Sequence, residues 1–325
     1  MSSLSRKIAY LLVGVMAVIA IVLFARHSES KPTATQAPKV RVAVLNLTSN
    51  LPHYIAQEEK LFEKHGLAPE FVPFASSNQA VEAMVRGDID LGIGISFIPF
   101  ITVEQKEPGK LKIHNTSRMT SEHPFDRFIV KQDSPITDVK QLAGKKVGLF
   151  PGTSATNLSK DYLKKQGVDV NTIEFVQMPP QNHLPALESG AVDALFAYEP
   201  GLTLALTKGA RAISPSVYAE LVQENPIGVG VITSKFASEQ PTATKQAIAA
   251  VDEAIRFQDE QEAKARAIAK KVFTFEQPVA DQFSLTPIFE STKISKAKVK
   301  ELAEKLVTIG ELQTIPNTDN IYYQP

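Results

Sequence analysis

The pattern of apolar and polar positions contains one helix-to-strand step that occurs twice. Residues 184–201 predict an amphipathic helix, a stop at Gly190, a short apolar strand over 192–196 and a turn into a further helix. Residues 80–100 predict the same order, with the helix stop at Gly87. Glycine supplies the left-handed conformation in which many helices end, and a short, nearly continuous apolar run is typical of a buried strand.

Both copies of the step carry the sequence Gly-x-[Ile/Val]-Asp, which ends at Asp90 in the first copy and at Asp193 in the second. A spacing of about one hundred residues is too long for a solenoid repeat, so the pattern predicts two lobes of similar architecture. Ligands of open α/β sheets bind at the carboxyl ends of strands, and we therefore expect a ligand between the lobes. The two aspartates lie too far apart in this arrangement to form an acid–base pair, which favours a loop or capping role.

The rest of the chain alternates strands with helices, which predicts parallel sheets covered on both faces. We interpret residues 120–126 and 227–233 as crossovers, and the C-terminal part is helical and often amphipathic. The sequence therefore predicts an α/β fold with two lobes joined by two crossover strands and a helical C-terminal tail. We place the first lobe at residues 40–122 plus 232–325 and the second lobe at residues 123–231.

The N-terminus contains an uncharged apolar run, residues 8–24, that follows Arg6 and Lys7. A basic start and an apolar core are typical of an export signal, and the run also reaches the lower length limit for a membrane-spanning helix. Residues 1–25 are therefore either a cleaved signal peptide or an uncleaved membrane anchor, and residues 26–39 are a polar, flexible linker. Both alternatives predict a periplasmic or other extracytoplasmic location, with the membrane as a partner if the segment is uncleaved.

Composition excludes several classes of function. The chain has 35 Lys and Arg against 35 Asp and Glu, without a dense basic stripe, which argues against nucleic acid as a partner. It has no Cys, so disulfides, thiolate metal sites and a Cys nucleophile are excluded. Its histidines are scattered, without the His-x-x-x-His or His-x-Glu spacing of metal sites. We expect neither a metal nor a cofactor.

Residues suited to catalysis are few. The chain lacks the Gly-x-Ser-x-Gly turn that carries a nucleophilic serine in many hydrolases. Near the expected cleft, acid–base chemistry would depend on His53, His183 and Glu199. An enzyme would need two of these groups within about 3 Å of each other. We therefore predict no catalytic residues and no enzymatic activity.

The clearest local candidate for a ligand contact is the turn at Gly152 that leads into a helix. The first N–H groups of a helix have no partner within it, and the helix dipole attracts an anion there. The hydroxyls of Thr153 and Ser154 would add donors. An ordinary N-cap explains the same residues, and the missing Lys after the glycine argues against a nucleotide-binding loop.

Other polar residues follow the strand ends that face the expected cleft. They are Ser49, Asn50, Ser76, Ser77, Ser96, Tyr198 and Glu199. Each alone could be a cap or turn residue, but together they predict a lining rich in neutral hydroxyls and amides, which suits a small anion or a polar solute. Glu199 either binds an amine or arginine group or begins the next helix, where an acidic residue is favoured.

Several short motifs also occur in a characteristic order along residues 40–233. They are SNLP at 49–52, EKLFEKHGL at 59–67, LAGKKVG at 142–148, GTS at 152–154 and EP at 199–200, together with the two Gly-x-[Ile/Val]-Asp copies. With this set the chain resembles the nitrate, sulfonate, taurine and thiamine-precursor group of ABC-transporter solute-binding proteins.

The resemblance implies a type II periplasmic-binding-protein fold that closes on its ligand by hinge motion. It implies ligand contacts at all the strand-end residues named above and at Thr153 and Ser154, and delivery of the ligand to an ABC permease driven by its ATPase. The expected ligand is a small anion (sulfonate, taurine, nitrate or carboxylate) or a solute like a thiamine precursor, bound by a monomer. A membrane-anchored ligand-sensing module and an enzyme on the same fold are the alternatives.

Overall fold

Two β-sheets organise residues 37–324, the part of the chain that this computed structural model describes; the side chain of Ser154 also lies outside it. The expected signal or anchor, and residues 26–36 of the expected linker, fall outside the described residues. Residues from Pro38 onward form one compact unit. Within the described part, no helix combines the length and the apolarity that crossing a bilayer requires.

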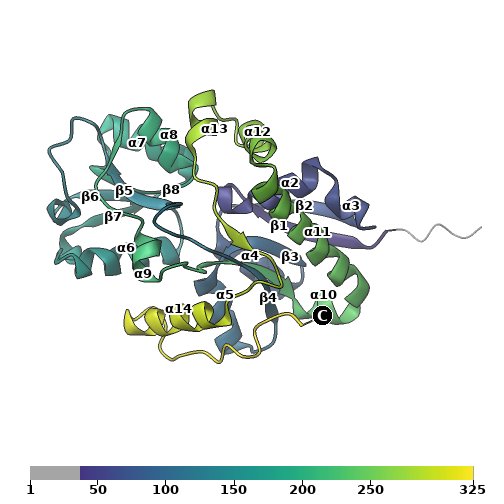
Figure 1. The fold of residues 1–325 in the computed structure, drawn as a ribbon. Coiled ribbons are helices and arrows are strands. Elements are labelled where there is room, and N and C mark those ends of the chain that lie inside the picture. Colours follow the sequence, from purple (N-terminus) through teal and green to yellow (C-terminus); the bar gives the residue numbers. More distant parts are fainter. Residues whose placement is uncertain (1–36, 325) are drawn as a thin grey trace, which may run out of the picture. The chain divides into compact units, whose positions relative to one another are not determined.

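The first sheet has six strands in the order β11-β4-β10-β3-β1-β2 (Figure 1). They are β1 (Lys39–Leu45), β2 (Ala68–Phe74), β3 (Leu91–Ser96), β4 (Leu111–Ser117), β10 (Gly228–Thr233) and β11 (Ile288–Phe289). Strand β1 pairs in parallel with β2 and β3, whereas β10 runs antiparallel to β3 and β4. With the helices packed on it, this sheet forms the first lobe.

The second sheet has five strands in the order β7-β6-β8-β5-β9. They are β5 (Asp126–Val130), β6 (Lys146–Leu149), β7 (Glu174–Gln177), β8 (Ala194–Tyr198) and β9 (Arg211–Ala212). Strand β6 pairs in parallel with β7 and β8, and β5 runs antiparallel to β8 and β9. This sheet and its helices form the second lobe.

The two sheets share one topology. In the first sheet β1 lies between its parallel partners β2 and β3, and in the second sheet β6 lies between β7 and β8. An antiparallel strand is then inserted in each sheet: β10 lies between β3 and β4, and β5 lies between β8 and β9. The inserted strands, β5 and β10, are those that follow the two crossings between lobes. Strand β10 belongs to the first sheet along its whole length, so the lobe boundary expected between residues 231 and 232 falls inside a strand. Placing that boundary just before β10 is our proposal.

The repeated aspartates stabilise the same place in both lobes. Asp90 accepts a hydrogen bond from Arg41 N at 2.8 Å and donates its own N–H to Arg41 O at 2.9 Å. Asp193 accepts from Lys146 N at 2.8 Å and donates to Lys146 O at 2.8 Å. Asp90 thus joins the start of β3 to β1, and Asp193 joins the start of β8 to the start of β6. Both contacts agree with the expected capping role.

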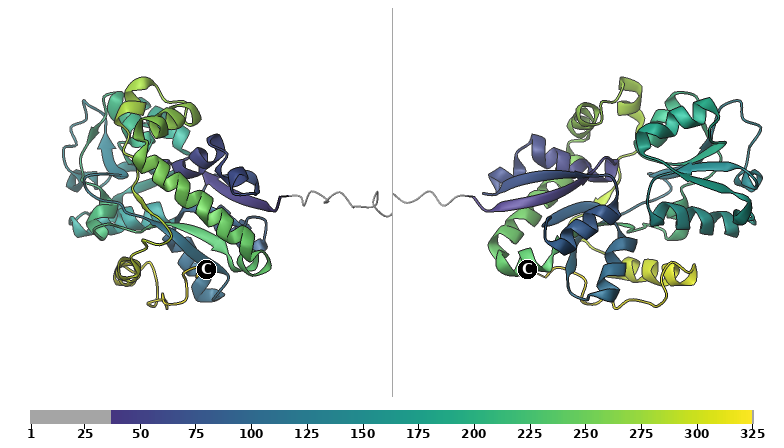
Figure 2. Two further views of the ribbon diagram at one scale, coloured as in Figure 1. Left: turned by 45° about the vertical axis from the view of Figure 1, so that its right-hand side comes forward. Right: turned by 180° about the vertical axis from the view of Figure 1, so that it is seen from behind.

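Helices cover both faces of each sheet (Figures 1 and 2). On the first sheet, one face packs against α2 (Leu51–Glu58), α3 (Leu61–Lys64), α10 (Ser234–Glu239), α11 (Pro241–Glu260) and α12 (Glu262–Val272), and the other against α4 (Ser77–Arg86) and α5 (Phe97–Lys106). Successive residues of β1 serve the two cores: Val42 packs with the α2 side and Ala43 with the α4 side, as the two-residue period of a strand requires.

On the second sheet, α6 (Thr153–Lys165) and α9 (Val217–Leu221) cover one face, and α7 (His183–Ser189) and α8 (Gly201–Thr207) cover the other. On the first sheet, α2 and α3 are separate helices, because Lys60 between them adopts a left-handed conformation with φ 53°. The C-terminal part adds α13 (Gln277–Gln282) and α14 (Lys296–Thr308).

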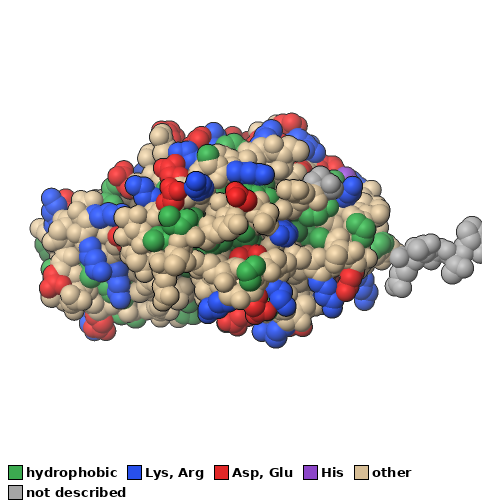
Figure 3. Space-filling model, turned by 90° about the horizontal axis from the view of Figure 1, so that it is seen from below, with side chains coloured by type: hydrophobic (Ala, Val, Ile, Leu, Met, Phe, Trp, Pro, Cys, Tyr) green, Lys and Arg blue, Asp and Glu red, His purple; other side chains and the backbone are tan. Residues whose placement is uncertain are grey.

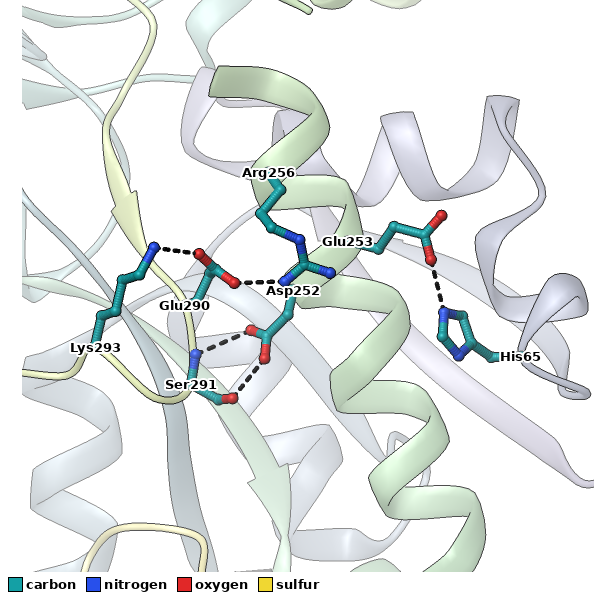
Figure 4. Close-up of polar contacts among 7 residues, drawn as sticks. All are labelled: His65, Asp252, Glu253, Arg256, Glu290, Ser291 and Lys293. Atoms are coloured by element: carbon teal, nitrogen blue, oxygen red, sulfur yellow. Dashed lines mark hydrogen bonds and ion pairs between the residues drawn. The ribbon is translucent and has the colours of Figure 1, made fainter. Parts of the chain in front are cut away.

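Polar contacts fix the C-terminal segment to the first lobe (Figure 4). On helix α11, Asp252 accepts hydrogen bonds from Ser291 N at 2.9 Å and from Ser291 Oγ at 2.5 Å. Glu290 pairs with Arg256 at 2.5 Å and with Lys293 at 2.6 Å. The chain just after β11 is therefore held against the longest helix among the described residues.

Candidate functional site

A cavity of about 60 Å³ lies at the carboxyl ends of β1, β3 and β8, and both lobes line it. This is the position at which open α/β sheets bind ligands. The first lobe contributes mainly serine hydroxyls, and the second lobe contributes mainly aromatic rings. None of the described residues in the lining carries a formal charge.

The first-lobe wall is built from residues at strand and helix ends. Ser49 lies in the 3₁₀ turn Thr48–Asn50 after β1, Ser96 ends β3, and Ser77 and Asn78 begin α4. Ser96 N donates a hydrogen bond to Ser77 Oγ at 2.9 Å, which fixes the end of β3 against the start of α4. Parallel strands bring these residues together because their carboxyl ends meet at one edge of the sheet.

Three helices begin at this cavity. Ser77 is the first residue of α4, Ser96 is the N-cap of α5, and Gly152 is the N-cap of α6. The first N–H of α5, that of Phe97, donates to Ile227 O at 2.7 Å, whereas the start of α6 has no side-chain cap. Helix N-termini present free N–H groups and a partial positive charge, so the cavity has the donors that an anion needs without a basic side chain.

The second-lobe wall is aromatic. Phe125 stacks on Tyr198 with ring centroids 5.2 Å apart, and Phe150 lies 5.8 Å from the same ring. The hydroxyl groups of Tyr198 and Tyr218 are 2.7 Å apart and share a hydrogen bond. Burial raises the pKa of both phenols, so both stay neutral and present an apolar face with one polar edge.

Asp126 supports this wall from behind. Its carboxylate accepts hydrogen bonds from Ser216 Oγ at 2.8 Å and from Val217 N at 2.7 Å, and so holds the start of α9, which carries Tyr218. Burial raises the pKa of Asp126 to about 7, because desolvation outweighs these donors. The group does not line the cavity.

Of the candidates whose side chains are described, the structure brings four to the cavity wall: Ser49, Ser77, Ser96 and Tyr198. Asn50 is buried beside the wall, where its Oδ1 accepts from Leu45 N at 3.0 Å. Ser76 is the N-cap of α4 and accepts from Gln79 N at 3.4 Å. Both residues therefore form bonds that stabilise the loops behind the wall.

Thr153 and Glu199 lie outside the lining. Thr153 begins α6 with an exposed side chain that is not part of the lining, and Ser154 follows it in the first turn. Glu199 is buried; its Oε1 accepts from Thr203 Oγ1 at 2.7 Å, and Ser284 N lies 3.4 Å away. Burial raises the pKa of Glu199 to about 7. Of its two interpretations, these bonds favour the start of a helix.

Of the aromatic wall, sequence reasoning identified Tyr198 but not the other rings. Phe150 directly follows β6, so the argument from carboxyl strand ends also applies to it, whereas Phe125 precedes β5 and reaches this edge because β5 runs antiparallel to β8. Tyr218 carried no such signal, because it lies in α9, a short helix that the apolar pattern did not predict.

The three residues suited to acid–base catalysis, His53, His183 and Glu199, do not hydrogen-bond to one another. His53 is buried without a hydrogen-bond partner, and burial lowers its pKa. His183 bonds Met178 O at 3.0 Å, and Glu199 has the partners given above. None of these three residues bonds to another. Among the described residues, no three His, Asp or Glu side chains are grouped as a metal site would require.

Two sheets of one topology with a cavity between them define the fold of two-lobed periplasmic solute-binding proteins. The periplasmic aliphatic sulphonate binding protein SsuA from Escherichia coli matches with a TM-score of 0.70 and 22% identity, over 88% of this chain and 92% of that chain. The alkanesulfonate-binding protein SsuA from Xanthomonas axonopodis pv. citri, bound to MOPS, matches with a TM-score of 0.73 and 19% identity, over 90% and 100%. The desulfurization enzyme DSZB shares the fold, with a TM-score of 0.63 and 14% identity over 88% and 96%.

The model of the NMT1-like family matches residues 33–272, and the chain belongs to that family. A putative aliphatic sulfonates-binding protein of Bacillus subtilis is 25% identical, over 69% of this chain and 67% of that protein. The nitrate/nitrite binding protein NrtA of Synechococcus elongatus is 25% identical, over 78% and 66%. These matches span about two thirds of the relatives' own lengths.

Proposed function

We propose that this chain is the extracytoplasmic solute-binding component of an ABC importer, and that it binds a small organic anion without transforming it. The curated relatives named above are binding proteins for sulfonates or nitrate, which supports a solute-binding role. Delivery to a permease and its ATPase, and an extracytoplasmic location, follow from the same relationship. The membrane contributes as a partner if the apolar N-terminal segment is retained.

The observation that carries the proposal is the two-sided cavity. Its first-lobe wall offers serine hydroxyls and the N-termini of α4 and α5, and the N-terminus of α6 adds donors from the second lobe, which suits the head group of a sulfonate or carboxylate. Its second-lobe wall offers aromatic rings, which suit an apolar portion of the same solute. Among the candidate ligands, this arrangement favours a sulfonate or carboxylate with a hydrocarbon part over nitrate, which has none. A thiamine-precursor-like ring would use the aromatic wall alone.

Capture would proceed by closure of the lobes on the solute. In the closed cavity the aromatic wall would exclude water, and the hydroxyl and N–H donors of the lining would replace the water that hydrates the anion. The occupied, closed form is what a permease would recognise, because ligand binding shifts the population toward it. A membrane-anchored sensing module would use the same cavity but would require no permease.

Isothermal titration calorimetry of the full chain in mild detergent tests the proposal. Alkanesulfonates, taurine, nitrate, aliphatic and aromatic carboxylates and pyrimidines would be titrated in turn. We expect an organic sulfonate or carboxylate to bind, and Ser96→Ala to weaken binding roughly tenfold through loss of a hydrogen bond to a charged group. Ser189→Ala, which changes an exposed serine of α7 outside the lining, is the control. Binding of none of these solutes by the folded chain would contradict the proposal.

A further inference from the structure

Residues 283–287 join α13 to β11 and contact both lobes; we call them the joining segment. Ser284 N approaches Glu199 Oε1 of the second lobe at 3.4 Å. Thr286 Oγ1 lies 3.5 Å from Thr48 Oγ1 of the first lobe, and Thr286 O accepts from Gln258 Nε2 at 3.0 Å. The segment is therefore in contact with one lobe through Ser284 and with the other through Thr286.

Both contacts fall one residue from a cavity wall. Glu199 directly follows Tyr198, which belongs to the aromatic wall, and Thr48 directly precedes Ser49, which belongs to the hydroxyl wall. A change in the joining segment therefore acts on the residues next to both walls. Two crossings alone leave two lobes free to rotate about a hinge, and a third link restricts that rotation.

Both ends of the segment are fixed. At the first-lobe end, β11 pairs with β4, and α11 binds the residues after β11 through Asp252 and Arg256 (Figure 4). At the second-lobe end, the Glu199 carboxyl is buried and is held by Thr203. Loss of the Glu199 side chain would leave buried donors without an acceptor, which makes this the costlier end to break.

We propose that residues 283–287 form a third connection between the lobes, which sets the separation of the cavity walls, with Glu199 and Thr286 as positioning residues. The proposal rests on the function proposed above, because it takes these walls to be the ligand-binding surfaces. A solute that needs both walls binds only the fraction of molecules whose walls are correctly spaced. Breaking the connection at either end lowers that fraction without removing any group from the cavity.

The first experiment needs no ligand. Because the chain has no Cys, Lys64→Cys on α3 and Lys164→Cys on α6, both exposed, place one spin label on each lobe of the full chain in mild detergent. We expect Glu199→Ala and Thr286→Val each to broaden the interlobe distance distribution measured by double electron–electron resonance. Glu301→Gln is the matched control, because it removes an ion pair with Lys298 that lies within α14. Distributions unchanged in both test variants would overturn the proposal.

The second experiment measures affinity for the solute identified by calorimetry. We expect each single variant to weaken binding about tenfold, as a fall in the competent fraction to one tenth would do. The double variant should be no weaker than the weaker single variant, because a connection broken at one end is already lost. Two unrelated local roles would instead give additive effects, which would contradict the proposal. If no solute binds but the distance distributions broaden, the proposed function fails and the third connection stands.

Discussion

Gly94 shows how closely single residues are packed at the cavity wall. Its φ is +62°, and a Cβ at this position would lie 2.8 Å from Ser49 Oγ and 2.7 Å from Asn50 Nδ2. We expect Gly94→Ala to displace both side chains and to weaken solute binding more than tenfold. The left-handed backbone should also cost about 1–2 kcal/mol of unfolding free energy. Calorimetric titration and urea unfolding measure the two effects separately.

Gly190 provides the matched control for that change. It has a φ of +76°, but a Cβ there would meet no atom within 4 Å. Gly190→Ala should therefore lower the unfolding free energy by the same amount, about 1–2 kcal/mol, and leave solute affinity unchanged. Equal loss of affinity in the two variants would mean that backbone strain, rather than contact at the wall, explains the effect of Gly94→Ala.

The two buried carboxyls make stability depend on pH. Burial raises the pKa of Asp126 and of Glu199 to about 7, above the ordinary values of the unfolded chain. At these two groups the folded state therefore binds more protons, and their contribution to the unfolding free energy falls as pH rises from about 4 to about 7, by on the order of 3 kcal/mol per group. Burial lowers the pKa of His53, His114 and His183, which acts in the opposite direction, so the measurement is the difference in urea unfolding between the unmodified chain and Glu199→Gln from pH 4 to 8. We expect the unmodified chain to lose stability relative to Glu199→Gln as pH rises; a difference that stays constant would contradict the prediction.

At the scale of elements, the repeated aspartates join strands with different strength. Asp90 is buried and also pairs with the guanidinium of Arg41 at 2.6 Å, whereas the Asp193 side chain is exposed. We expect Asp90→Ala to cost about 2–3 kcal/mol of unfolding free energy and Asp193→Ala about 1 kcal/mol. Asp88→Ala, which breaks only an exposed pair with Arg86, should cost less than about 0.5 kcal/mol. The reverse order of the two repeat aspartates would show that burial does not decide the cost.

Elements that follow local rules could be predicted from the sequence. The helix stops at Gly87 and Gly190 adopt left-handed φ values, and the strands after them lie in the sheets as expected. Helix α9 was not predicted, because it is short, and α13 was not distinguished within the helical C-terminal part for the same reason. The strand-end rule located the cavity, but it could not tell which neighbours face it. Asn50, Ser76 and Glu199 turn to backbone or hydroxyl partners that only the folded chain supplies.

At the scale of the molecule, charge is spread rather than concentrated. On the face shown in Figure 3, Lys and Arg side chains lie among Asp and Glu side chains without a continuous field of one sign. This agrees with the balanced composition. For the anion that we propose as ligand, the face in Figure 3 offers no continuous positive surface for steering, so selection would depend on the neutral donors of the cavity.

The lobes should unfold together, because one apolar core continues through both. It contains Ala43 of β1 in the first lobe and Phe128 of β5 in the second, together with residues of both crossings such as Met119. We expect a single calorimetric unfolding transition that includes both lobes, with equal van't Hoff and calorimetric enthalpies. A solute at about one hundred times its dissociation constant should add about 2.7 kcal/mol and raise the midpoint of this single transition by about 5 °C. Two transitions, or a solute that raises only one of them, would show that the shared core does not couple the lobes.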